Sequence, residues 1–268
     1  MGVIEPNFQV YGVTIAFKVL PERAAMCGYL ERTYGEYSFA EALKPSGLGN
    51  IYAELDGRPP GKSSFQPAVA NLMHRTIPDV VIENDEGERK LINPVWWYDT
   101  VIKNGELRSA GKQSFNARNL QLPTWQEPIR YRRGIAMMTG LGESIFTKPE
   151  NKGKQQFLMR AEKPILLGIL YQRLDDDIYS AAVITRQPQN KFKVYHDKAT
   201  PFFINPDKYF VDKWLSKKVT EEDPDIADLL LRPTWFQRME VQRVKTFTGA
   251  QLFKNSVTEI LEPLANRL

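Results

Sequence analysis

The chain has few of the residues that build metal centres and covalent scaffolds. Its 268 residues include one cysteine and two histidines. A single cysteine excludes an internal disulfide framework and a zinc ribbon, so we expect a reducing, cytoplasmic setting and no metal or other cofactor. No apolar run reaches the roughly 18 residues of a membrane helix, and residues 1–26 lack the basic start of a signal peptide. We therefore expect no membrane partner.

The charge balance and hydrophobic content are those of an ordinary globular chain. The sequence has 36 basic and 32 acidic residues, a net charge of +4, and is 42% hydrophobic. This composition permits a polyanionic partner without requiring one. We predict a single domain over residues 27–268 and expect a monomer. Residues 1–26 are interpreted as a leader that is removed or as a misassigned start.

The residue pattern predicts an α+β fold dominated by antiparallel β-sheet, with a few peripheral helices. Ser38 and Glu41 have capping-box spacing, which predicts a short helix, and the Gly- and Pro-punctuated segment 44–62 predicts a long loop. A turn at residues 84–87 between two apolar runs predicts a hairpin. Further strands are expected at 132–138, 156–160, 165–172, 179–186 and 191–195, and helices at 206–217, 224–231 and after Ser256. No βαβ alternation or internal repeat is present.

The single cysteine, Cys27, follows Met26 and precedes Gly28. If everything through Met26 is removed, one residue carries both a free α-amine and a free thiol. An α-amine titrates at roughly 7.7 to 8.0, so a good fraction is nucleophilic at neutral pH. Such a 1,2-aminothiol attacks an aldehyde twice and closes a five-membered thiazolidine ring. The alternative is that Cys27 is a small buried hydrophobic residue near the start of a strand.

Four polar residues are candidates for a site. Asn116 and Arg118 alternate in an expected strand, so their amide and guanidinium share one face. Glu143 follows an apolar strand in a glycine-containing loop, where burial would raise its pKa and suit it to proton transfer. His196 is a candidate proton shuttle. The alternatives are a solvated strand end, a loop glutamate and a structural histidine.

Aromatic and basic residues suggest a nucleic-acid surface. Trp96 and Trp97 are adjacent, so in a strand only one packs easily into the core and the other should be exposed. An exposed tryptophan stacks on an unpaired base, and Arg132 and Arg133 are candidate phosphate contacts. The alternatives are a core aromatic pair and a solvated basic run.

The order and spacing of these residues resemble the SOS response-associated peptidase family. The resemblance is carried, in this order, by Met26-Cys27-Gly28, Trp96-Trp97-Tyr98, Phe115-Asn116-Ala117-Arg118, Arg132-Arg133, Gly140-Leu141-Gly142-Glu143 and His196-Asp197-Lys198-Ala199-Thr200-Pro201. It extends to the segment 243–250. It implies curved sheets or an open barrel and a protein that binds single-stranded DNA containing abasic sites. It also implies covalent capture of those sites by an N-terminal cysteine, which family members expose by removing the initiator methionine or, autocatalytically, a short leader.

The same resemblance implies a role for each candidate. Cys27 would be the nucleophile, Asn116 would hold the sugar, and Arg118 would contact a flanking phosphate. Glu143 and His196 would move protons during imine formation and sugar-ring opening. Trp96 and Trp97 would line the DNA groove. Tyr29 stands where the family usually has arginine.

Two other functions are compatible with the residues alone. One is a cysteine amidohydrolase or protease that uses Cys27 and His196 and turns over amide substrates. The other is a non-catalytic single-stranded DNA-binding protein that binds ordinary and abasic strands alike.

Overall fold

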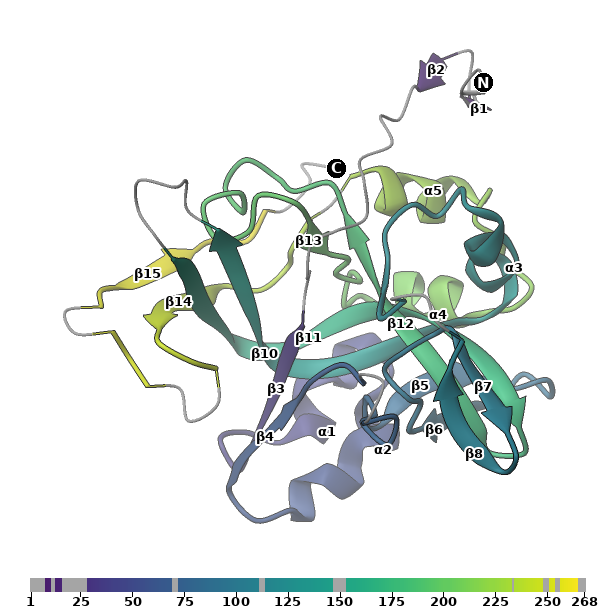
Figure 1. Ribbon diagram of the computed structural model, residues 1–268, viewed down its shortest axis with the longest axis horizontal. Coiled ribbons are helices and arrows are strands. Elements are labelled where there is room, and N and C mark those ends of the chain that lie inside the picture. Colours follow the sequence, from purple (N-terminus) through teal and green to yellow (C-terminus); the bar gives the residue numbers. More distant parts are fainter. Residues whose placement is uncertain are drawn as a thin grey trace.

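A long antiparallel pair of strands forms the centre of the structure. The computed structural model describes residues 8–10, 13–15, 28–68, 72–110, 114–146, 153–232, 234–247, 251–253 and 256–264. β10 (Arg133–Phe146) pairs with β11 (Lys154–Asp175), from Arg133 opposite Leu170 to Phe146 opposite Lys154. Figure 1 shows this pair crossing the middle of the molecule. The other main strands attach to it.

These strands form an 11-stranded sheet whose main path is β13-β12-β11-β10-β3-β4. The remaining strands of the sheet are β3 (Tyr29–Tyr34), β4 (Gly61–Phe65), β5 (Val80–Glu83), β6 (Arg89–Ile92), β9 (Asn116–Ala117), β12 (Ile178–Arg186), β13 (Thr200–Pro201), β14 (Met239–Val244) and β15 (Thr258–Leu261). Two separate hairpins are β1 (Phe8–Val10) with β2 (Val13–Ile15), and β7 (Thr100–Lys103) with β8 (Glu106–Ser109). The pairs are antiparallel apart from β9 with β12. The predicted α+β class with a large antiparallel sheet is confirmed, and over the described residues the sheet is not closed into a barrel.

The helices are short and begin at capping residues. They are α1 (Phe39–Ala42), α2 (Gly49–Tyr52), α3 (Pro123–Tyr131), α4 (Lys208–Leu215) and α5 (Pro224–Leu231), with 3-10 turns at Lys44–Ser46 and Ala53–Gly57. Ser38 accepts a hydrogen bond from the Glu41 amide and Asp223 caps α5, as predicted. α4 begins two residues later than predicted, because Asp207 caps it while Asn205 accepts from the Asp207 amide. Within the described residues, no helix is both long and apolar enough to cross a membrane.

Three sequence predictions of local structure were wrong. Segment 44–62 is not a loop, because its apolar side chains Leu48, Tyr52 and Leu55 are buried and its backbone forms helical turns. Residues 191–195 form turns rather than a strand, since the amides of Phe192 and Lys193 both donate to the Gln189 carbonyl. The helix expected after Ser256 is the strand β15.

The reason for the last error is a long-range contact. The Ser256 hydroxyl accepts from the Arg243 amide at 3.1 Å instead of capping a helix. β15 then pairs with β14, from Met239 opposite Leu261 to Gln242 opposite Thr258. A capping pattern read locally cannot detect such a partner.

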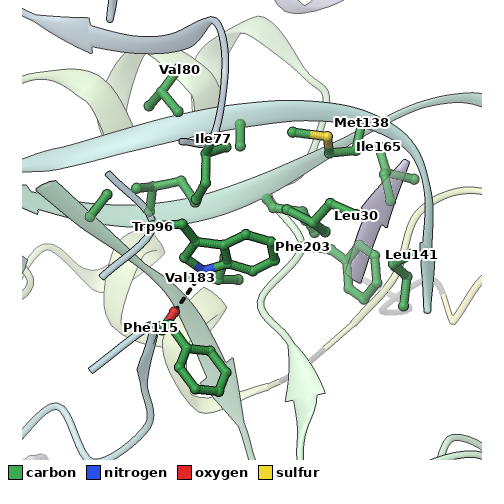
Figure 2. Close-up of a cluster of buried hydrophobic side chains, with 14 of the residues drawn as sticks. Leu30, Ile77, Val80, Trp96, Phe115, Met138, Leu141, Ile165, Val183 and Phe203 are labelled. Carbon is green, nitrogen blue, oxygen red and sulfur yellow. Dashed lines mark hydrogen bonds between the residues drawn. The ribbon is translucent and has the colours of Figure 1, made fainter. Parts of the chain in front are cut away.

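Apolar side chains cover both faces of the central sheet. One cluster surrounds Trp96, whose indole N–H donates to the Phe115 carbonyl at 2.9 Å (Figure 2). The other lies under the helices and includes Trp125 of α3 and Trp214 of α4. Neighbouring residues of β12 alternate between the two, with Val183 in the first and Ile184 in the second. The polar residues described next lie around the carboxyl end of β12 and the distal half of β10.

Candidate active site

Glu143 and His196 form a buried contact between β10 and the segment after β12. Glu143 is not in a loop, as the sequence suggested; β10 continues past an irregularity between Met138 and Gly140 and carries Glu143 within the strand. Both residues are 2% exposed, and Glu143 Oε2 lies 3.6 Å from His196 Nδ1. A carboxyl group and an imidazole therefore share a site withdrawn from water.

The hydrogen bonding of His196 determines which ring nitrogen is basic. Nδ1 lies 2.6 Å from the Ser144 carbonyl, which only accepts, so Nδ1 carries the hydrogen. Burial lowers the pKa of His196 below its usual value, although the Ser144 hydrogen bond and Asp197 act in the opposite direction. Nε2 is buried and has no hydrogen-bond partner among the described residues. In the neutral ring, Nε2 is therefore the basic nitrogen.

This lowered pKa predicts a dependence of stability on pH. As the pH falls, unfolded His196 binds its proton at about 6.5, before the folded residue does. Stability is therefore complete above that value and falls as the solution becomes more acidic. Urea denaturation between pH 8 and 5 should show this slope, and His196→Gln should flatten it. The exposed His74 is the matched control; an equal effect of His74→Gln would contradict the assignment.

Asn116 lies in β9, which pairs in parallel with β12, and Arg118 directly follows that strand. Ala117 lies beside Ile184 and packs in the cluster under the helices, so Asn116 and Arg118 share the opposite face. The Arg118 guanidinium donates to the Lys198 carbonyl, and burial lowers the pKa of Arg118. The charges of Arg118 and Lys198 also contribute to the lowered pKa of His196, which places all three close together.

The strand that follows the cysteine runs beside Glu143. Cys27 itself lies outside the described residues, and Gly28, to which it is bonded, is half-buried. Tyr29 pairs with Gly142 in the antiparallel ladder of β3 and β10. Gly142 directly precedes Glu143, so β3 begins beside the part of β10 that carries Glu143, two residues after Cys27.

Two threonines were missed by the sequence reasoning. Thr185 and Thr200 are fully buried, and their hydroxyls have no hydrogen-bond partner among the described residues. Thr185 is two residues beyond Val183 and lies on the face that carries Asn116 and Arg118. The only signal in the sequence is a polar residue ending an apolar strand, which is too common to identify a site.

Comparison with known families identifies this chain. The sequence model of the SOS response associated peptidase (SRAP) family matches residues 26–250. The chain belongs to the SRAP family. Membership supports a role in the DNA damage response and an interaction with DNA, and it fits a peptidase-like enzyme that processes abasic sites. No match was found among curated proteins.

Solved structures show the same fold at low sequence identity. A phage-related protein of Bordetella bronchiseptica has a TM-score of 0.53 and 14% identity, over 87% of this chain and 100% of that protein. A Bacteroides thetaiotaomicron protein has a TM-score of 0.52 and 18% identity, over 81% of this chain and 92% of that one. A second Bordetella bronchiseptica protein has a TM-score of 0.51 and 15% identity, over 82% of this chain and 100% of that protein. These similarities support the fold alone.

The two adjacent tryptophans of this SRAP chain are both buried. Trp96 is 0% and Trp97 9% exposed, so the expectation that one is exposed was wrong. The chain bends at this point instead of continuing as a strand, and alternation does not apply. Trp96 donates to the Phe115 carbonyl (Figure 2). The ring centroids of Trp97 and Phe115 are 6.0 Å apart. Both tryptophans pack in the hydrophobic core.

Arg132 and Arg133 lie away from the other candidate residues. Arg133 is 3% exposed and donates to four backbone carbonyls, those of Ile129, Trp214, Ser216 and Val219. Arg132 pairs with Glu127 at 3.0 Å. Glu143 is ten residues further along β10, roughly 30 Å at strand spacing. We therefore assign Arg133 a structural role and place neither arginine in the site.

Gly142 has no room for a side chain because Phe247 covers it. A Cβ at Gly142 would lie 2.6 Å from a ring carbon of Phe247, which stacks on Tyr29 with centroids 4.9 Å apart. Gly142→Ala should therefore reduce the free energy of unfolding by about 1 to 3 kcal/mol. Adding Phe247→Leu should recover part of the loss. Urea denaturation measures the free energy of unfolding of both variants. Gly57→Ala is the control, since nothing lies near a Cβ there. Equal stability of Gly142→Ala and Gly57→Ala would contradict the prediction.

Among the described residues, no group of three or more histidine, aspartate or glutamate side chains is arranged to hold a metal ion.

Proposed function

We propose that this SRAP protein binds single-stranded DNA and captures abasic sites as a thiazolidine cross-link through Cys27, after removal of residues 1–26. The main support is the buried pair of Glu143 and His196 near the start of β3, which begins at Tyr29, two residues after Cys27. Covalent capture of an aldehyde requires proton transfers, and these two side chains are suited to them.

The reaction has three balanced steps. A general acid protonates the ring oxygen of the closed deoxyribose while a base removes the proton of its 1-hydroxyl, so the ring opens to the aldehyde. The α-amine of Cys27 adds to the carbonyl carbon, and loss of water leaves an imine. The thiolate then adds to the imine carbon, the nitrogen takes a proton, and the thiazolidine ring closes. Overall, one water is released.

The neighbouring side chains supply the other requirements of this reaction. Glu143 acts as the proton donor, and neutral His196 accepts a proton at Nε2. The amide of Asn116 holds the opened sugar. Arg118 and Lys198 supply positive charge beside the reacting group for a flanking phosphate.

Removal of the leader is part of the proposal. While residues 1–26 are attached, the nitrogen of Cys27 is an amide and does not attack an aldehyde. We propose cleavage before Cys27, by the protein's own site. Intact-mass measurement of protein from its native host should give a chain that starts at Cys27; a mature chain that retains Met26 would remove the proposed activity.

A denaturing gel tests the proposed function. The chain beginning at Cys27 is incubated with a single-stranded oligonucleotide that carries one abasic site, and with the undamaged oligonucleotide. A heat-stable, slower band is expected for the abasic strand only. If both strands bind equally and non-covalently and that band is absent, the protein is a non-catalytic single-stranded DNA-binding protein. If the protein turns over amides without DNA, it is a hydrolase.

A further inference from the structure

Arg186 ends β12 on the face opposite to the proposed reaction site. It is two residues beyond Ile184, which packs under the helices, and it pairs with Thr200 across the ladder of β12 and β13. Thr185, the residue between, lies on the face of Asn116 and Arg118. The proposed reaction site and Arg186 therefore lie on opposite faces of the sheet at the same end of β12.

The Arg186 side chain is partly withdrawn from water, and its Nε has no hydrogen-bond partner in the part of the chain that the structure describes. Its Nε is buried with no hydrogen-bond acceptor among the described residues, where no carboxylate forms an ion pair with it. Burial alone lowers the pKa of Arg186 to about 10, with no opposing contribution from an acidic side chain. The hydroxyl of Thr200, its neighbour across the ladder, is also buried and has no hydrogen-bond partner within the described segments.

The other strongly buried arginines show what is missing. Arg133 bonds four carbonyls, and Arg32 bonds Asp79 and the Met137 carbonyl. A desolvated charge without such partners is unfavourable, and it favours an anion from outside the chain. A guanidinium beside a hydroxyl presents only hydrogen-bond donors to an incoming acceptor, which suits a phosphate group.

We propose that Arg186 and Thr200 bind a backbone phosphate of the single-stranded DNA, outside the abasic nucleotide. This inference rests on the proposed function. A strand whose abasic sugar lies on the Asn116 face reaches Arg186 by passing over the end of β12. The phosphate would neutralise the guanidinium, and Thr200 would donate its hydroxyl hydrogen to the same group.

Thermal unfolding of the DNA-free protein separates this role from a structural one. Arg186→Gln removes an unneutralised charge, so the variant should melt at the same temperature as the wild type or higher. Arg133→Gln, which breaks bonds to carbonyls, should melt several degrees lower. A comparable drop for Arg186→Gln would show that Arg186 is structural and would overturn the proposal.

Salt dependence of DNA binding identifies the ligand. In a Cys27→Ala background, affinity for an undamaged oligonucleotide is measured over a range of NaCl concentrations. Each phosphate contact on single strands contributes about 0.7 to the slope of log K against log salt. Arg186→Gln should reduce the slope by about that amount and weaken binding several-fold. Arg173→Gln is the control, because Arg173 is exposed and pairs with Asp176.

The DNA-binding measurements distinguish failure of the Arg186 proposal from failure of the proposed function. If the background protein binds DNA and Arg186→Gln binds with the same affinity and slope, the Arg186 proposal fails while the proposed function stands. If the background protein does not bind DNA, the proposed function fails as well. If inorganic phosphate raises the melting temperature through Arg186 but the DNA slope is unchanged, the site binds a free oxyanion and the DNA contact is excluded.

Discussion

Cys27→Ala in the chain that begins at residue 27 is expected to abolish heat-stable cross-linking to an abasic oligonucleotide. Alanine retains the α-amine and still forms an imine, but without sulfur the imine is not locked in a ring and hydrolyses on heating. Reversible binding should be nearly unchanged, because the phosphate contacts of the DNA do not involve the thiol. The loss on a denaturing gel should therefore be complete.

The retained amine provides an internal control for this experiment. Borohydride reduces an imine to a stable amine, so Cys27→Ala trapped with borohydride should still yield an adduct. Fluorescence anisotropy with the same oligonucleotide verifies that the variant binds. A heat-stable adduct that persists in Cys27→Ala without borohydride would exclude Cys27 as the residue that forms the cross-link.

Glu143→Gln is expected to lower the cross-linking rate by about 10²- to 10⁴-fold, the usual contribution of a positioned acid or base. Glutamine has nearly the same shape and leaves the contact with His196 sterically intact, but it does not supply a proton. Affinity for the abasic strand should change little. Single-turnover cross-linking on a denaturing gel measures the rate, and Glu162→Gln is the control, since Glu162 is a half-exposed carboxylate of β11.

His196 should add a pH dependence to the same rate. Its pKa is lowered by burial, so the imidazole is neutral at pH 7 and the rate should fall only when the pH drops below that lowered value. His196→Gln should be slow at every pH and lack this acidic limb. Rates within about threefold of the wild type for both Glu143→Gln and His196→Gln would show that proton transfer by this pair is not required.

The sequence was sufficient for the features that depend on near neighbours. The hairpin of β5 and β6 follows from its turn at residues 84–87, and α5 begins at the Asp223-Pro224 pair as expected. The alternation also predicted that Ala117 faces away from Asn116, and Ala117 packs in the cluster under the helices. The family resemblance, carried by short motifs in a fixed order, agrees with the match over residues 26–250.

The features that depend on distant partners were not predictable. The glycines before Glu143 suggested a loop, but pairing with β3 and β11 holds that segment in a strand. Arg133 resembled a phosphate contact because no local pattern reveals the carbonyls around it. The buried polar groups of Thr185, Arg186 and Thr200 are recognised only once the burial of each atom is known.

The mass of the purified cross-link, with fragmentation of its N-terminal peptide, shows directly whether Cys27 forms the thiazolidine. We expect the adduct mass to equal the mass of the protein plus the oligonucleotide minus one water. The protein chain should start at residue 27, and both the nitrogen and the sulfur of Cys27 should be attached to one sugar carbon. An adduct on a lysine, or on a chain in which Met26 still precedes Cys27, would contradict it.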